Sequence, residues 1–280
     1  MAGFTGFFTL DAARERAART HLICRAAAQR TRRRLVFSHL TLLELRGMTL
    51  KPPATLDVER LHVTTDSMRR KSHLRGVQDH LWTGRMETTA IDDLIDGVSV
   101  EQAVCQMALY ADQDSLTMIM DWLTCANAEL RQSTTERLRD AIDGFGRFPG
   151  IRRCRAALSR SVAGTDSPQE TLLRLTMIDA GLPCPLVNHE IPDADASTIW
   201  RVDMAYPRER VAIEYDGEYH YDRHRWRSDL RKRNRLQDLG WTVLVAVKDV
   251  LNDTGRLNEF LLMIIHARSR GTDVGQAPMS

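Results

Sequence analysis

Apolar residues recur at helical spacing through most of the first half of the chain. Residues 11–34 are rich in alanine and arginine and contain no glycine or proline, and residues 38–45 form a second apolar segment. Residues 114–123 and 151–162 show the same helical spacing further on. This half is therefore predicted to be mainly helical.

Two short segments interrupt that pattern, and two motifs mark where helices begin. Residues 60–64 alternate in polarity and predict a strand, as residues 76–82 do more weakly. A serine followed three residues later by Gln or Glu predicts a capping box, in which each side chain satisfies a free amide of the helix start. The two pairs are Ser99 with Gln102 and Ser133 with Glu136.

The second half follows a different order of elements. A helix is predicted to start at Ser167 and to stop at Gly181. A charged helix and a final helix are expected further on, separated by a β-branched apolar strand. The full set comprises strands at residues 186–191, 199–205, 210–215 and 241–247, and helices at residues 225–239 and 258–267.

The segment at residues 163–168 separates these two patterns and predicts a linker. We expect a mainly helical domain at residues 1–166 and a second domain at residues 167–270 that combines helices with a sheet. Residues 271–280 are polar and contain Gly and Pro, so they predict a disordered tail. The fold class is mixed α and β.

Composition limits the compartment and the binding partners. Apolar residues make up 43% and charged residues 27% of the chain, and no stretch is apolar for as long as a membrane span requires. The N-terminus lacks the pattern of a signal peptide, and five isolated cysteines suggest reduced thiols, so we expect a cytoplasmic protein. The net charge is only +2, so any nucleic-acid contact must come from local clusters.

Acidic residues stand where strands usually carry apolar ones. Asp203 lies in one predicted strand, and Glu214 and Asp216 share one face of the next. Several carboxylates on one sheet face repel each other unless a cation lies between them. Mg²⁺ or Mn²⁺ fits, because hard cations prefer oxygen ligands and supply activated water. Alternatively, the acids are solvated or pair with Arg201 and Arg210.

Glu170 has two interpretations that its spacing does not separate. Ser167, Pro168 and Glu170 form a capping box with proline at the first helical position. The same carboxylate, in the first turn of this helix, can also belong to the metal site.

The charged helix offers indirect support for a site. Asp229, Arg233, Leu236 and Gly240 share one helical face, on which an arginine needs an acidic partner. That partner is either Asp229, or a phosphate or the strand carboxylates.

Basic residues and histidines surround this helix. The basic run is equally consistent with a solvated face and with a track for the phosphate backbone. It comprises Arg223, Arg225, Arg227, Arg231, Lys232 and Arg235. His220 and His224 are four residues apart, but a zinc site needs a third ligand, so His220 is expected in a loop as a proton carrier or phosphate contact.

Together these residues resemble the very-short-patch-repair-like endonuclease domain of the PD-(D/E)XK nuclease superfamily. The motifs that carry the resemblance are Ser167-Pro-Gln-Glu170, Ala180-Gly-Leu-Pro183, Arg201-Val-Asp203, Glu214-Tyr-Asp-Gly217, His220, Asp229, Arg233 and Gly240-Trp241. The resemblance implies a core of helix, three strands, helix and strand, with Glu170, Asp203 and Glu214 as its acids. The lysine that the superfamily carries after the second acid falls on Asp216, and no lysine is expected near the acids.

The first half resembles, more weakly, actinobacterial proteins related to abortive-infection type IV antitoxins. The likeness rests on Phe37-Ser-His39, Leu45-Arg-Gly47, His62-Val-Thr64, Arg69-Arg70 and Gly76-Val77. Those proteins usually begin with a DNA-binding winged helix, and this chain is expected to start after it.

Three functions follow as hypotheses. The first is an Mg²⁺-dependent deoxyribonuclease in which Glu170, Asp203, Glu214 and Asp216 hold the metal, while His220 and Arg233 assist. The second is an inactive nucleic-acid-binding or antitoxin-like protein with a toxin–antitoxin partner. The third is a purely structural helical module. DNA is the expected ligand of the first, and no membrane contact is expected.

Overall fold

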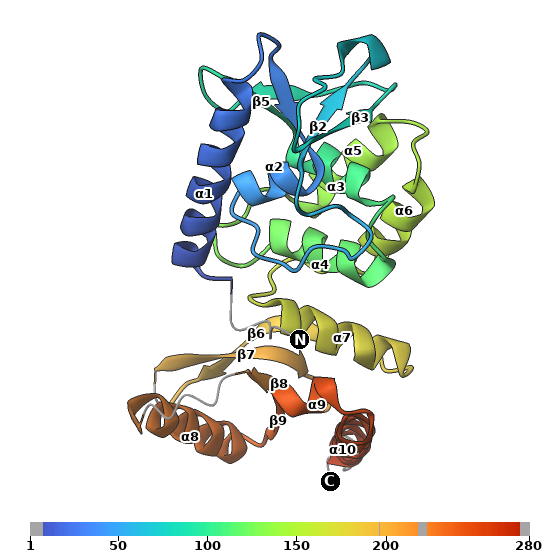
Figure 1. The fold of residues 1–280 in the computed structure, drawn as a ribbon. Coiled ribbons are helices and arrows are strands. Elements are labelled where there is room, and N and C mark those ends of the chain that lie inside the picture. Colours follow the sequence, from blue (N-terminus) through green and yellow to red (C-terminus); the bar gives the residue numbers. More distant parts are fainter. Residues whose placement is uncertain (1–7, 196, 218–222, 275–280) are drawn as a thin grey trace. The chain divides into compact units, whose positions relative to one another are not determined.

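The computed structural model describes residues 8–195, 197–217 and 223–274, which divide into two compact units. The N-terminal unit spans Phe8–Ala163, and the C-terminal unit begins at Gly164, inside the segment predicted as a linker. Each unit combines helices with one β-sheet (Figure 1). The predicted mixed α and β fold is therefore confirmed.

Helices make up most of the regular structure of the N-terminal unit, as predicted. They are α1 (Leu10–Ala28), α2 (His39–Leu45), the short 3-10 helix η1 (Met68–Arg70), α3 (Val100–Met107), α4 (Gln113–Leu123), α5 (Thr135–Gly144) and α6 (Ile151–Arg160). Ser99 caps α3 by accepting the amide N–H of Gln102 at 3.2 Å, as predicted. The cap of α5 is Thr134 instead of Ser133, because the Ser133 hydroxyl donates to the buried Glu101.

A five-stranded sheet accompanies these helices, in the order β3-β2-β1-β5-β4. The strands are β1 (Leu35–Phe37), β2 (Leu61–Thr65), β3 (Val77–Leu81), β4 (Thr88–Ala90) and β5 (Ile95–Val98). Only β2 and β3 were predicted. Leu35 and Phe37 of β1 pack with α1, whereas Val36 packs against the core that includes α2–α6, so both sheet faces are covered.

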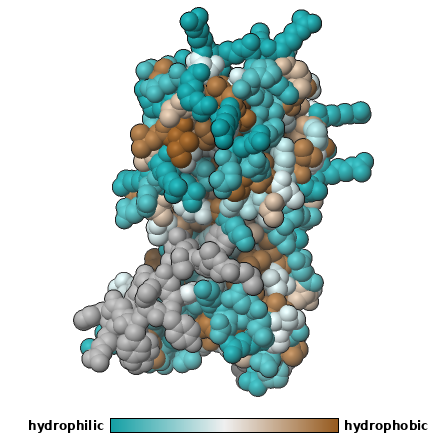
Figure 2. Space-filling model, in the orientation of Figure 1, coloured by the Kyte–Doolittle hydropathy of each residue, from teal (hydrophilic) through white to brown (hydrophobic). Residues whose placement is uncertain are grey.

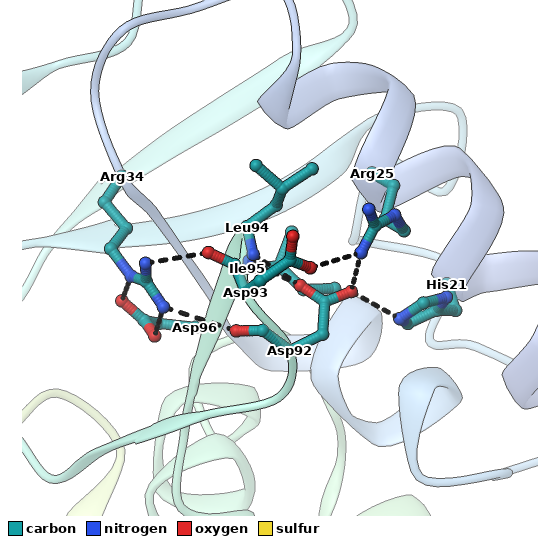
Figure 3. A network of polar contacts seen from close by, with 8 residues as sticks. All are labelled: His21, Arg25, Arg34, Asp92, Asp93, Leu94, Ile95 and Asp96. Atoms are coloured by element: carbon teal, nitrogen blue, oxygen red, sulfur yellow. Dashed lines mark hydrogen bonds and ion pairs between the residues drawn. The ribbon is translucent and has the colours of Figure 1, made fainter.

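Helix α1 ends at Ala28, earlier than the predicted residue 34, because the chain turns there to enter β1. A polar network ties α1 and β1 to the loop before β5 (Figure 3). Arg25 reaches Asp92 at 2.6 Å and Asp93 at 2.8 Å, and Arg34 forms a bidentate contact with Asp96. These aspartates therefore have a structural role.

The C-terminal unit contains a four-stranded sheet in the order β6-β7-β8-β9, in which β8 and β9 are parallel and the other neighbours antiparallel. Its elements are α7 (Pro168–Asp179), β6 (Leu186–Asp193), β7 (Thr198–Tyr206), β8 (Val211–Asp216), α8 (Arg223–Asp238), β9 (Thr242–Val247), α9 (Lys248–Asn252) and α10 (Thr254–Val274). The predicted order is present, with α9 added. Residues 271–280 were predicted to be a disordered tail, but residues 271–274 belong to helix α10. Residues 275–280 lie outside the described residues.

Alternation along β8 distributes the core of this unit over two sheet faces. Val211 and Ile213 join the cluster that α7 and α10 complete. Ala212 joins the opposite cluster, in which α8 contributes the fully buried Leu236. The sheet thus lies between α8 on one side and α7 with α10 on the other (Figure 1).

Hydrophilic residues predominate on the face drawn in Figure 2, with apolar residues in smaller patches. Over the described residues, the helices are too short or too polar to cross a lipid bilayer.

Candidate active site

Glu170 lies in the first turn of α7 and is 1% exposed. The Ser167 hydroxyl accepts the Glu170 N–H at 3.1 Å, which confirms the predicted N-cap. The carboxylate accepts the N–H of Asp166 at 3.0 Å through Oε2, while the buried Oε1 has no hydrogen-bond partner among the described residues. The cap therefore uses one carboxylate oxygen and leaves the other for a further ligand.

Asp203 lies in β7 beside the end of β8. The ladder between these strands pairs Met204 with Ile213, and its next step leads to Asp203 and Glu214. The Tyr215 N–H donates to Asp203 Oδ2 at 2.7 Å, so the side chain takes the place of a backbone acceptor. This bond fixes the Asp203 carboxylate next to β8.

Asp203 lies close enough to Glu170 and to Glu214 for their charges to interact. Burial, followed by the charge of Asp203, raises the pKa of Glu170 well above its ordinary value. Burial also raises the pKa of Asp203 to about 6, with a further contribution from Glu214 and against the opposing Tyr215 hydrogen bond. Both shifts favour the neutral acids, and a bound cation would favour the ionised forms of Glu170 and Asp203.

Glu214 has two basic partners on α8. Its side chain is 12% exposed, and its Oε1 contacts the Nζ of Lys232 from α8. Arg233 Nε lies 3.8 Å from Glu214 Oε2, and Arg233 Nη2 lies 3.8 Å from Asp216 Oδ2. The strand carboxylates, one of the two alternatives, are therefore partners of Arg233.

Lys232 corrects the expectation that no lysine lies near the acids. It is distant from them in sequence, but α8 returns along the sheet and places its ammonium group on Glu214. Lys232 and Leu236 are four residues apart, so they share a helical face, and Leu236 is fully buried. The four-residue spacing to Leu236 could have indicated that Lys232 faces the sheet. From the sequence, Lys232 was predicted only as part of a phosphate track.

The alternative in which Arg201 and Arg210 neutralise the strand acids does not match the contacts. Arg201 pairs with Asp166 at 3.1 Å, and Arg210 donates to the carbonyl oxygen of Leu239 at 3.5 Å. Asp216 differs from the other acids, since half of its side chain is exposed. Asp216 therefore lies at the rim of the carboxylate cluster.

The basic run of α8 divides into residues with different roles. Arg227 and Arg231 are exposed, as a phosphate track requires. Arg235 instead holds the fully buried side chain of Asp193 with two contacts of 2.6 Å, and it also reaches Asp195 at 2.9 Å. Arg235 is thus a structural residue and we remove it from the predicted track.

Three predicted residues cannot be placed in this site. His220 lies outside the described residues, and the side chains of Arg223 and Arg225 do so as well.

The residues present suit a hard cation by their chemistry. Glu170, Asp203 and Glu214 supply oxygen ligands only, and Glu170 Oε1 is a buried acceptor without a donor. Within the described residues, no three His, Cys, Asp or Glu side chains are already arranged as a metal cage. Binding would therefore require the carboxylates to turn toward one point, with Lys232 moving from Glu214.

Comparison with known proteins gives relatives without an assigned role. Two uncharacterized proteins of Mycobacterium tuberculosis, from strains CDC 1551 / Oshkosh and ATCC 25618 / H37Rv, are each 34% identical to this chain over 137 residues. The match covers 48% of this chain and 47% of each relative, so the chain spans about half the length of these curated relatives. No family model and no solved structure matches the chain.

Proposed function

We propose that the C-terminal unit is a metal-dependent endonuclease that hydrolyses DNA phosphodiester bonds. The observation that carries this proposal is the position of Asp203 near both Glu170 and Glu214, beside Lys232, with the pKa values of Glu170 and Asp203 raised by burial and by a neighbouring carboxylate. Perturbed acids of this kind gather at catalytic sites. DNA is the substrate class that the resemblance to very-short-patch-repair-like endonucleases implies.

The three acids would hold Mg²⁺ or Mn²⁺ through carboxylate oxygens, with Asp216 at the rim. When bound, such an ion polarises the phosphoryl group and lowers the pKa of the attacking water. The Tyr215 N–H orients the Asp203 carboxylate through Oδ2.

Lys232 and Arg233 supply positive charge on the α8 side of the same acids. Lys232 is suited to stabilise the negative charge that develops on the phosphate during cleavage. Arg233 offers a planar guanidinium that matches phosphate oxygens, and Asp216 holds it near the acids. Arg227 and Arg231 extend this positive surface along α8 toward the DNA backbone.

One observation favours a second candidate, an inactive antitoxin-like protein that binds DNA or a toxin partner. Lys232 and Arg233 already neutralise Glu214, so part of the repulsion is relieved without a metal. In this alternative the ion pairs are permanent and the chain binds a partner without cutting DNA.

Cleavage of supercoiled plasmid with Mg²⁺, Mn²⁺ or EDTA separates the two candidates. The nuclease proposal expects nicked or linear plasmid with either metal and none with EDTA, and Lys232→Met should slow cleavage strongly. Asp238→Asn, on the same helix but away from the cluster, is the matched control. Absence of cleavage with every metal, on DNA and on RNA, together with capture of a toxin partner, would favour the second candidate.

A further inference from the structure

A cluster of three histidines lies in the N-terminal unit and has no part in the function proposed above. His39 follows β1 at the start of α2, and His62 and His80 lie on the neighbouring parallel strands β2 and β3. His39 and His62 are buried, at 4% and 1% exposed, while His80 is half-buried. Elements distant in sequence thus bring three imidazoles together inside one unit.

The rings lie within metal-binding range of one another. The ring centroids of His39 and His80 are 3.9 Å apart, those of His62 and His80 are 5.1 Å apart, and those of His39 and His62 are 5.9 Å apart. His62 Nδ1 and His80 Nε2 face each other at 2.8 Å. These two nitrogens form a hydrogen bond with each other, which a bound ion would have to replace.

His62 and His80 are also held from outside the cluster through their second nitrogens, and His39 is held through Nδ1. His62 Nε2 donates to the carbonyl oxygen of Asp57 at 2.9 Å, His39 Nδ1 contacts the Ser38 hydroxyl at 2.8 Å, and His80 Nδ1 contacts the Tyr110 hydroxyl at 3.2 Å. Histidines that bind metals have this arrangement, in which an oxygen partner fixes the tautomer and the orientation of the ring. Ser38 is the N-cap of α2 but makes no side-chain cap bond, since its hydroxyl is used on His39.

The surroundings favour an uncharged set of ligands next to a cation. Burial lowers the pKa of all three histidines, which keeps the imidazoles neutral, the form that binds metal. The nearby carboxylates have the opposite effect, because negative charge stabilises a cation: Asp57 raises the pKa of His62 and Asp79 raises the pKa of His80. His39 also adopts a positive φ of 49°, a strained conformation for a residue other than glycine.

We propose that His39, His62 and His80 form a site for one divalent transition-metal ion such as Zn²⁺. Imidazole nitrogens suit Zn²⁺, Co²⁺, Ni²⁺ and Cu²⁺, and three of them leave a further coordination position for water or another ligand. The stacked rings of His39 and His80 must turn apart to admit the ion, because the described side chains form no ready cage. The half-buried His80 and Tyr110 provide the route from solvent.

The test is to strip the full chain with a chelator, to add Zn²⁺ or Co²⁺, and to measure bound metal per chain and the Co²⁺ absorption spectrum. We expect one ion per chain with a four-coordinate Co²⁺ spectrum. The bound ion and the Co²⁺ spectrum should be kept in Asp203→Asn, which removes a ligand of the carboxylate site. They should also be kept in His266→Gln, which changes an exposed histidine of α10. Both should be lost in His80→Gln.

Tyr110→Phe tests the same site without removing a ligand. This variant keeps the ring that packs against His39 and His80 but loses the hydroxyl that orients His80. It should bind the ion about 10–100-fold more weakly, as removal of an outer partner typically does. A wild-type chain that binds no ion, or binding unchanged in Tyr110→Phe and in a folded His80→Gln, would overturn the site and leave hydrogen-bonded core histidines.

Discussion

Replacing Asp203 by asparagine should stabilise the metal-free protein. At pH 8 the folded chain holds this carboxylate ionised, although burial and Glu214 raise its pKa to about 6 from an ordinary 3.8. At ~1.36 kcal/mol for each pH unit between the folded and unfolded pKa values, the difference of about 2.2 costs about 3 kcal/mol. The amide keeps an oxygen to accept the Tyr215 N–H, so it removes the charge and preserves the bond.

We expect Asp203→Asn to raise the free energy of unfolding by ~1–3 kcal/mol at pH 8 in EDTA, since Glu170 and Glu214 retain part of the repulsion. A raised folded pKa means that the wild-type protein loses stability as the pH rises from about 4 through about 6. The advantage of the variant should therefore fall to about half at pH 5, where the folded wild type is largely protonated at Asp203.

Urea or thermal unfolding at pH 5 and pH 8 measures this effect. Asp216→Asn is the matched control, because its carboxyl lies on β8 and is half exposed, so its removal should change stability by no more than about 0.5 kcal/mol. Equal stability of the wild type and Asp203→Asn at both pH values would show that Asp203 is not held ionised against repulsion. That result would contradict the inference that Asp203 is repelled by neighbouring carboxylates.

Three further outcomes follow from the same contacts. Millimolar Mg²⁺ should raise the melting temperature of the wild type but not of Asp203→Asn; an unchanged melting temperature, with no heat on titration, contradicts a metal site. Changing Arg227 and Arg231 to glutamine should reduce the slope of log DNA affinity against log salt by roughly 1.8, at ~0.9 for each lost phosphate contact, whereas an unaltered slope makes them an ordinary solvated face. Arg235→Met removes the guanidinium partner of the buried Asp193, whose Oδ2 also accepts from Trp200 Nε1, and should cost about 3–5 kcal/mol of unfolding free energy; a loss below ~1 kcal/mol would refute its structural role.

Much of the C-terminal unit was predictable because its signals are local. Ser167 with Glu170 marks the helix start, and the apolar run at residues 241–247 marks the buried strand. The acids of β7 and β8 were conspicuous because carboxylates are unusual inside strands. Strand alternation and the short turn between these strands then brought Asp203 and Glu214 together.

The features that the sequence did not predict depend on tertiary contacts. Strands β1 and β4 have three residues each, too few to show an alternating pattern. They form because they pair with neighbouring strands of the five-stranded sheet. Lys232 and Arg235 belong to one basic run in the sequence. In the fold, the first contacts Glu214 and the second contacts the buried Asp193. The spacing to Leu236 places Lys232 on the buried face of the helix, but it does not identify either partner.

The proposed function requires Asp203 for cleavage, whereas folding and DNA binding do not require it. The most direct measurement compares single-turnover plasmid cleavage by the wild type and by Asp203→Asn with Mg²⁺, with DNA affinity measured for both proteins. We predict that the variant keeps its fold and binds DNA at least as tightly, since a negative charge near phosphate is removed, but no longer cleaves. A variant that cleaves as fast as the wild type would contradict the assignment of this site.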